Sequence, residues 1–277
     1  MSRMAGRPTN EGAPGAADST GSGYRDRNST AERALDILLM FDDDHLTVTA
    51  NQVAAHLEVA RSTAYRYLQS LASSGFIEEG APSGFRLGPR ILELARIARR
   101  SSGLREVARP IMLTLAQTTG ETVLLTRLAG STVLCLERSD SIQRVLRVSY
   151  EPGQSMPANA GASAHVLLAW LPEAELDSVL AGVTFERFTS ETITSQAALR
   201  KRLTETRRSG YAVSRGEVDT DVLGVAAPIW DGTDRVAAAI SVAAFATRVT
   251  GARVKATIAA VNEAAGQISA RLRLLSG

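Results

Sequence analysis

The polar side chains with the clearest chemical use lie between residues 61 and 73. On a 3.6-residue period this segment reads as a helix with two different sides. The apolar side carries Ala64, Tyr67, Leu68 and Leu71. The polar side carries hydroxyls, an amide and a guanidinium but no carboxylate, on Ser62, Tyr65, Arg66, Gln69 and Ser73. Such groups bind phosphate oxygens and base edges in the major groove, which predicts sequence-specific DNA binding.

The role of each side chain is assigned from its chemistry and its place. Four side chains are expected to contact the major groove and the phosphates: Ser62, Thr63, Tyr65 and Arg66. Three more are expected to make supporting contacts: Arg61, Gln69 and Arg86. A surface salt bridge is the alternative for Arg66, but no acid shares its side of the helix. The nearby acids, Asp42–Asp44 and Glu78–Glu79, are expected to lie away from this helix. For Arg86, an ordinary solvated strand arginine is an equal alternative.

Three helices and a hairpin must hold this polar side outward. Capping boxes at Ser29 and Thr49 begin the first two helices, and the helix with the polar side follows after a short turn. Residues 76–79 and 85–87 then read as two strands around a turn rich in glycine and proline. The sequence therefore predicts a winged helix-turn-helix over residues 29–88.

Segments of different composition flank this module. Residues 1–28 are rich in Gly, Ser, Ala, Pro and Asn and hold almost no large apolar side chain, so we expect a flexible arm. Residues 89–103 return to helical spacing with their arginines outward and are predicted to form a linker helix. A second domain is expected over residues 104–277, because a chain of 277 residues is long enough for two domains.

The second domain alternates short strands with helices. A helix is predicted from residue 104 to Thr119, followed by Gly120 as a left-handed cap. Short strands joined in hairpins, with helices around them, indicate an α+β domain built on an antiparallel sheet. The further helices are predicted at 162–170, 172–180, 195–209 and 252–274, and the strands at 122–128, 132–137, 145–150, 211–214, 225–230 and 236–244.

Composition excludes several classes of protein. A net charge of +2, with 22% charged residues, excludes a polyelectrolyte mode of nucleic-acid binding. The single cysteine, Cys135, permits no internal disulfide, suits a reducing cytoplasm and reads as a buried strand thiol. No apolar run reaches about 18 residues and the N-terminus has no hydrophobic segment, so neither a membrane span nor a secretion signal is expected. His45 and His56 lack partners at metal-ligand spacing, and no metal or cofactor is expected.

A family resemblance extends over nearly everything after residue 28. It rests on the shared order and spacing of short segments: 34–38 (ALDIL), 61–68 (RSTAYRYL), 84–90 (GFRLGPR), 108–110 (ARP), 119–122 (TGET), 191–194 (ETIT), 210–213 (GYAV), 225–229 (VAAPI) and 239–242 (AISV). In this order they resemble the isocitrate-lyase-regulator (IclR) family of bacterial transcription factors.

The resemblance implies both an architecture and a function. The architecture is a winged helix-turn-helix, a linker helix and an effector-binding domain of GAF-like α+β form. The function is that of a DNA-binding transcriptional regulator, with repression as the family's commoner mode. Homodimers, often paired as homotetramers, would bind palindromic operators in double-stranded DNA and respond to a small organic acid.

The resemblance also places an effector cavity between the loop before residue 162 and the last two strands. The positions that match the family's cavity are Ala162, Ser163, Ser214, Gly224, Ser241 and Ala243. The amides of Ala162 and Ser163 lie at a predicted helix N-terminus, where free N–H groups and the helix dipole favour a carboxylate.

Several of these positions depart from the family's pattern. Members that bind small keto acids usually have an acidic residue and a cysteine where this chain has Ser214 and Gly224, and a serine where it has Ala243. The family's stretch His-Cys/Ala-x-x-x-Gly-Lys reads NAGASAH here, over residues 159–165. Smaller and less polar side chains leave more room and fewer hydrogen bonds. We therefore expect an aromatic or medium-chain acid, bulkier and more apolar than glyoxylate or pyruvate.

Two other function classes remain open from the sequence. Ser163 and His165 nearly form a nucleophile elbow, which would make the second domain a hydrolase tethered to DNA, but the motif's second glycine is missing and no strand directly precedes it. The other alternative is an architectural DNA binder that takes no ligand. Asp219 and Asp221, near Glu217, could act as paired acids, although a pocket lid or a surface loop fits their context better.

Overall fold

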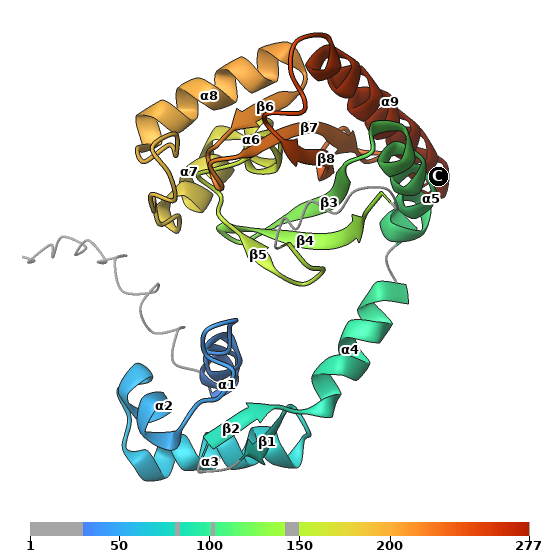
Figure 1. The fold of residues 1–277 in the computed structure, drawn as a ribbon. Coiled ribbons are helices and arrows are strands. Elements are labelled where there is room, and N and C mark those ends of the chain that lie inside the picture. Colours follow the sequence, from blue (N-terminus) through green and yellow to red (C-terminus); the bar gives the residue numbers. More distant parts are fainter. Residues whose placement is uncertain (1–29, 81–83, 101–102, 142–149, 277) are drawn as a thin grey trace, which may run out of the picture. The chain divides into compact units, whose positions relative to one another are not determined.

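The computed structural model describes residues 30–80, 84–100, 103–141 and 150–276 (Figure 1). They form two compact units, the first extending to Ala98 and the second starting at Arg99. The arm predicted at residues 1–28 lies outside the described residues. The α+β fold with two domains, predicted from the sequence, is confirmed.

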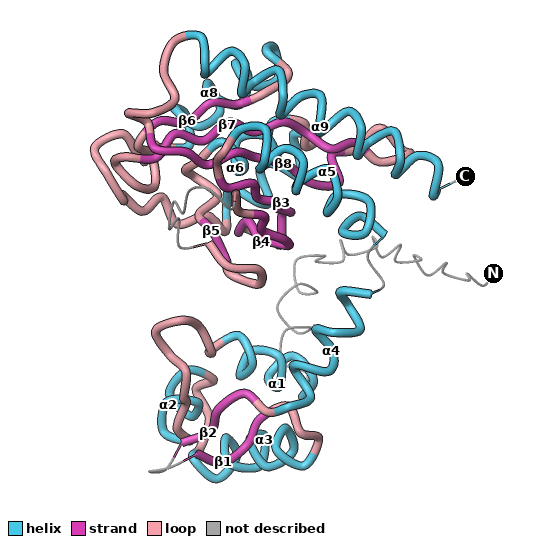
Figure 2. The backbone as a smooth tube through the Cα atoms, turned by 45° about the vertical axis from the view of Figure 1, so that its right-hand side comes forward, coloured by secondary structure: helices cyan, strands magenta, loops and turns pink. Residues whose placement is uncertain are grey.

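The first unit has the element order of a winged helix-turn-helix (Figure 2). Its elements are α1 (Thr30–Leu39), α2 (Ala50–His56), α3 (Arg61–Ser73), β1 (Ile77–Gly80), β2 (Gly84–Leu87) and α4 (Pro89–Arg100). The strands β1 and β2 pair antiparallel and form the predicted wing, and α4 confirms the helix predicted after residue 88.

The start of α2 shows why this segment becomes helical. The amide of Gln52 donates to the Thr49 hydroxyl over 3.3 Å, and the amide of Thr49 donates to the Gln52 side chain over 2.8 Å. These two bonds satisfy amides that have no partner within the helix, so the predicted capping box is confirmed. The other predicted capping box includes Ser29, which lies outside the described residues.

A small core fixes α3 against the rest of the first unit. Every element of the unit up to β2 contributes a buried side chain to this core: Ile37, Val53, Ala64, Leu68, Ile77 and Phe85. The hairpin returns close to the end of α3, where a Cβ atom on Gly88 would lie only 2.4 Å from the carbonyl oxygen of Gly75. Glycine at residue 88 therefore permits the close approach that holds the wing beside the helix.

The second unit consists of a six-stranded sheet and the helices on its two faces (Figure 1). Its elements are α5 (Gly103–Thr119), β3 (Thr122–Ala129), β4 (Thr132–Ser139), β5 (Ser155–Met156), α6 (Ala162–Ala169), α7 (Glu173–Ala181), α8 (Gln196–Ser209), β6 (Ala212–Arg215), β7 (Val222–Trp230), β8 (Val236–Phe245) and α9 (Ala252–Ser276).

The sheet is antiparallel throughout, with the strand order β5-β4-β3-β8-β7-β6. Helices α5 and α9 cover one face, and α6 lies on the other face beside α8. Side chains alternate between the faces along each strand. On β8, Ile240 and Val242 pack with α5 and α9, whereas Ala239 packs with α6.

Most of the elements predicted for the second unit are confirmed, with shifts of a few residues at their ends. Gly120 ends α5 in the left-handed conformation, with φ of 73°, as predicted. The two-residue strand β5 was not predicted, because two residues give no periodic signal. The strand predicted at 145–150 lies outside the described residues except for Tyr150.

Cys135 lies on β4 and is buried, as predicted. Burial raises the pKa of its thiol to about 11, so the thiolate is scarce near neutral pH. Within the part of the chain that the structure describes, no helix is long and apolar enough to cross a membrane. No group of three or more His, Cys, Asp or Glu residues in that same part is placed to hold a metal ion.

Candidate functional site

The polar side of α3 is exposed and its apolar side is buried, as the helical period predicts. Ser62, Arg66 and Gln69 are exposed, whereas Leu68 is fully buried. Ala60 precedes the helix and gives it no side-chain cap. The amides of Arg61 and Ser62 are therefore not satisfied by a capping side chain and can face an anion, whereas that of Thr63 donates to the Ala60 carbonyl.

Two of the predicted DNA-contacting residues share a hollow of about 350 Å³ between α2, α3 and the hairpin. Arg61 and Tyr65 line it together with Asn51 of α2. The Tyr65 ring is 46% exposed and packs edge-on against Phe85 of the wing, with the ring centres 6.2 Å apart. Thr63 is half-buried and thus less accessible than its neighbours on α3.

The expectation that the acids of the wing lie away from α3 is wrong. The Gln69 side-chain amide donates to the carboxylate of Glu79 over 3.2 Å. Glu78 stands opposite Arg86 in the β1–β2 register, and their side chains form an ion pair of 2.8 Å. The hairpin returns beside α3 instead of leading away from it, so two of the predicted supporting contacts, Gln69 and Arg86, have acidic partners.

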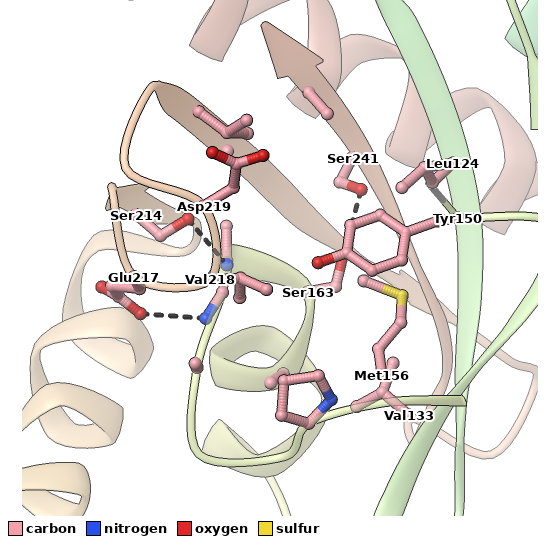
Figure 3. A pocket seen from close by; sticks show the side chains of 18 of the residues that line it. Leu124, Val133, Tyr150, Met156, Ser163, Ser214, Glu217, Val218, Asp219 and Ser241 are labelled. Atoms are coloured by element: carbon pink, nitrogen blue, oxygen red, sulfur yellow. Dashed lines mark hydrogen bonds between the residues drawn. The ribbon is translucent and has the colours of Figure 1, made fainter. Parts of the chain in front are cut away.

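The second unit contains a cavity of about 390 Å³ at the N-terminus of α6 (Figure 3). All six residues predicted for the effector site line it: Ala162, Ser163, Ser214, Gly224, Ser241 and Ala243. They come from α6 and from three neighbouring strands. Apolar side chains that include Leu124, Val133 and Met156 form other parts of the wall.

Strand register explains why distant residues meet in this cavity. Ser214 pairs with Gly224 across β6 and β7, and Gly224 pairs with Ala243 across β7 and β8. The three residues therefore form one row across the sheet on the face that α6 covers. Ser241 lies two residues from Ala243 on β8 and so points to the same face.

The polar groups of this row have partners inside the protein (Figure 3). The amide of Ala162 donates to the Ser214 hydroxyl over 3.0 Å, and the Ser163 hydroxyl donates to the Ser241 hydroxyl over 3.0 Å. The Ala162 amide was predicted to bind a carboxylate, but Ser214 already accepts from it. The amides of Ser163 and Ala164 in the first turn of α6 donate no hydrogen bond within the described residues.

The glycine at residue 224 does not enlarge the cavity as the sequence suggested. A Cβ atom there would lie 2.6 Å from the Ser214 hydroxyl and 3.3 Å from the Ala162 Cβ. The space left by the missing side chain is thus occupied by the Ser214–Ala162 contact. Glycine is required here by the close approach of β6 and α6 to β7.

Glu217 is the main site residue that the sequence did not single out. It follows β6, its side chain is only 3% exposed, and it lines the cavity. Its Oε2 accepts from the Gly161 amide over 2.9 Å, and its Oε1 accepts from Arg202 over 3.2 Å. Burial raises the pKa of Glu217 above its usual value, while the Gly161 amide and Arg202 oppose that rise.

His165 is a residue of α6, lies next to Glu217 and is fully buried. Its Nε2 is 3.3 Å from Oε2 of Glu217, but neither ring nitrogen has a hydrogen-bond partner within the described residues. Burial, with a smaller effect of the Arg202 charge, lowers the pKa of His165 to about 3. The imidazole is therefore neutral at ordinary pH.

This geometry removes the basis for the hydrolase alternative. A serine nucleophile needs a base within hydrogen-bond reach. The Ser163 hydroxyl is bonded to Ser241, and His165 makes no hydrogen bond to Ser163. Asp219, which the sequence placed on a pocket lid or a surface loop, is exposed and lines the cavity, whereas the neighbouring Glu217 lines it and is buried.

Comparison with known families accounts for both units. Residues 30–80 match the family described as the IclR helix-turn-helix domain, and residues 98–270 match bacterial transcriptional regulator IclR C-terminal. The chain belongs to the IclR family of bacterial transcriptional regulators. The two matches together cover most of the described residues, and the resemblance inferred from short segments is confirmed.

Two relatives of this IclR-family protein are HTH-type transcriptional regulators. It is 36% identical over 270 residues to the HTH-type transcriptional regulator BhcR of Paracoccus denitrificans, covering 96% of this chain and 94% of that protein. It is 31% identical over 227 residues to the HTH-type transcriptional regulator XynR of Escherichia coli, covering 81% of this chain and 89% of that protein.

Solved structures show the same fold. A putative IclR transcriptional regulator from Silicibacter superposes with a TM-score of 0.80 at 28% identity, covering 88% of this chain and 96% of that one. An IclR homologue from Microbacterium hydrocarbonoxydans, complexed with 4-hydroxybenzoate, superposes with a TM-score of 0.71 at 29% identity, covering 89% of this chain and all of that one.

The cavity of this IclR-family protein also includes residues from segments that the sequence did not connect with it. Tyr150 and Gln154 precede α6, and Phe188 and Thr189 belong to the loop before α8. The Thr192 hydroxyl in that loop donates to the carbonyl oxygen of Glu217 over 2.6 Å. This bond gives the family segment 191–194 a structural role in holding the cavity wall.

Proposed function

We propose that this protein is an operator-binding repressor that a small organic acid controls. The observation that carries the DNA-binding part is the exposed polar side of α3. Ser62, Thr63, Tyr65 and Arg66 would contact the major groove and the phosphates, and Arg61 would support them. Arg86 would contribute only after it exchanges its partner Glu78 for a phosphate, and Gln69 after it leaves Glu79.

We also propose that the protein binds a palindromic operator as a homodimer or homotetramer. A two-fold dimer presents two copies of α3 to two half-sites, about one DNA turn or a multiple of it apart. Large apolar side chains that remain exposed on α1 and α4 support self-association, namely Leu35, Leu39, Leu92, Leu94 and Ile97. Residues 89–103 would pass the effect of the acid to the dimer.

The effector proposed is an aromatic or medium-chain carboxylic acid. A cavity of about 390 Å³ is in the range of small-molecule sites and exceeds what a two-carbon or three-carbon acid would fill. The Ser163 and Ala164 amides are available to a carboxylate, and apolar side chains that include Leu124, Val133 and Met156 form one part of the wall. The homologue complexed with 4-hydroxybenzoate supports this class of ligand. An architectural DNA binder without a ligand would have no use for such a cavity.

The DNA-binding proposal is tested by Arg66→Ala. If Arg66 grips a guanine with two hydrogen bonds, the substitution should weaken operator binding by about 1–3 kcal/mol and relax base preference at one position. The operator is first located by genomic footprinting, and affinity is then measured by gel shift. Arg208→Ala is the control, because it removes the same charge from an exposed position in the other unit.

The two substitutions separate a local contact from a general effect of charge. A loss confined to Arg66→Ala supports the contact. Equal losses in both variants, or an unchanged affinity and base preference in Arg66→Ala, would contradict the role assigned to this arginine.

A further inference from the structure

The protein's own carboxylate occupies the end of α6 where an acid effector would bind. Glu217 Oε2 accepts a hydrogen bond from the amide of Gly161, the first N–H group at this helix N-terminus without a partner in the helix (Figure 3). The next amide, that of Ala162, is taken by Ser214. The amides left for a ligand are therefore those of Ser163 and Ala164, within one helical turn of Gly161, whose amide donates to Glu217.

The charges around Glu217 do not neutralise a second carboxylate. Its counter-charge is Arg202 of α8, which also lies 3.8 Å from Glu205. Glu191, in the loop before α8, adds negative charge, and His165 of α6 is uncharged. Among the described residues that line the cavity, the charged side chains are Glu217 and Asp219, both acidic.

Two carboxylates at one poorly solvated site do not both remain ionised. When they lie close together, a proton is bound more tightly by the pair than by either group alone. Glu217 already has a raised pKa because it is buried, so it is the group that protonates when a second negative charge arrives. An effector acid in contact with the Ser163 amide brings that charge.

Building on the proposed acid effector, we propose that the acid binds as its carboxylate together with one proton from the solvent, which Glu217 takes up at Oε2. The O–H bond forms on the oxygen that lies 3.3 Å from Nε2 of His165. That nitrogen has no hydrogen-bond partner within the described residues and is fully buried, so it can accept from the new O–H. Glu217 thereby makes the affinity for acids depend on pH, while the affinity for neutral ligands does not.

Calorimetry of the full-length protein measures the proton directly. The panel contains 4-hydroxybenzoate, phenylacetate, hexanoate, pyruvate and glyoxylate, with 4-hydroxybenzamide as a neutral analogue of the first. The tightest acid is titrated near pH 7 in two buffers whose enthalpies of ionisation differ. The difference in binding heat should correspond to about one proton taken up per acid bound. For the neutral amide the two buffers should give the same heat.

Two variants separate Glu217 from the other acidic residue of the cavity. Glu217→Gln keeps an acceptor for the Gly161 amide and removes the charge, so the acid should bind at least as tightly and with no proton uptake. Asp219→Asn alters the exposed carboxylate and should leave the proton uptake intact. If Glu217→Gln does not fold, the affinity of the wild-type protein for the acid is measured as a function of pH. Uptake of one proton on binding should weaken that affinity by up to tenfold for each unit of rising pH.

Each outcome supports or overturns the inference. Proton uptake that disappears in Glu217→Gln and remains in Asp219→Asn supports it. An acid that binds without proton uptake overturns it and leaves the proposed acid effector standing. Uptake that persists in Glu217→Gln also overturns it. If no acid on the panel binds, the proposed effector class fails, and the inference fails with it.

Discussion

Helices α3 and α6 belong to the same chain but present their polar residues in opposite ways. On α3, Arg66 and Gln69 are exposed while Leu68 between them is buried. On α6, all eight residues are buried, including Ser163 and His165. On α3 the exposed polar side chains can reach a molecule from outside, even where one of them, Gln69, also bonds to Glu79. On α6 the Ser163 hydroxyl is hydrogen-bonded to Ser241, and the buried His165 ring faces the protein interior.

The contrast shows how far a helical period can be interpreted. Such a period identifies the two sides of α3 because water covers one of them. Helix α6 has the sheet on one side and α8 on another, so it shows no comparable difference between sides. A polar residue on α6 can be interpreted only once its neighbours in space are known.

The largest expected effect compares adjacent positions on the two helices. On α3, Leu68→Ala should lower the free energy of unfolding of its unit by about 2–5 kcal/mol, because it leaves a cavity in the core. Gln69→Ala should change that energy by less than about 0.5 kcal/mol. On α6, Leu167→Ala and Leu168→Ala should both cost about 2–5 kcal/mol, because both are buried. Denaturant unfolding checks all four; a near-neutral Leu167→Ala would contradict the contrast.

The next effect depends on pH and on His165. The folded protein keeps this imidazole neutral, with a pKa of about 3, whereas its unfolded value is 6.5. The unfolded chain therefore binds more protons below pH 6.5, and stability falls as the pH is lowered from there, by up to about 1.4 kcal/mol per pH unit. His165→Gln should flatten this fall in denaturant unfolding between pH 7 and 5.

Glu217 has the opposite effect on how stability depends on pH. Its pKa in the folded protein is raised above the usual 4.5, so the stability that it contributes is lost as the pH rises. Because Glu217 lies 3.3 Å from His165, the comparison is repeated in a Glu217→Gln background, where the difference made by His165→Gln belongs to the imidazole alone. Parallel pH profiles for the two proteins would show that His165 is not the titrating group.

A smaller effect is expected at the Ser214 hydroxyl, which accepts from the first amide of α6. Ser214→Ala leaves this buried amide without its partner and should cost about 1–3 kcal/mol of unfolding free energy. Ser178→Ala, on the exposed side of α7, is the matched control and should be neutral. Equal stability of the Ser214→Ala variant and wild type would mean that water replaces the hydroxyl.

The smallest effect tests whether the acid of the wing holds Arg86 back from DNA. Glu78→Gln removes the partner of Arg86 and should tighten operator binding by less than about 1 kcal/mol, because exposed ion pairs are weak. Gel shifts at low and moderate salt measure the gain. The gain should vanish in an Arg86→Ala background; if it persists there, the lost negative charge alone explains it.

Many features of the molecule could be predicted from the sequence because each depends on residues that are close together in the chain. The Thr49 capping box, the glycine that ends α5 and the two sides of α3 each depend on residues within a few positions of one another. The order of short segments indicated the family, and the family indicated the six cavity positions. The placement of Glu78 and Glu79 failed because a hairpin's direction depends on how closely Gly75 and Gly88 can approach.

The sequence alone determined which segments form helices and strands, the exposed side of α3 and the family to which the chain belongs. The tertiary structure decided that Glu217 is buried in the cavity wall, that Ser214 occupies the space beside Gly224, and that His165 has no hydrogen-bond partner among the described residues. The physical reason is that periodicity describes an element's own sides, whereas burial, charge and hydrogen bonding depend on elements that are distant in the chain.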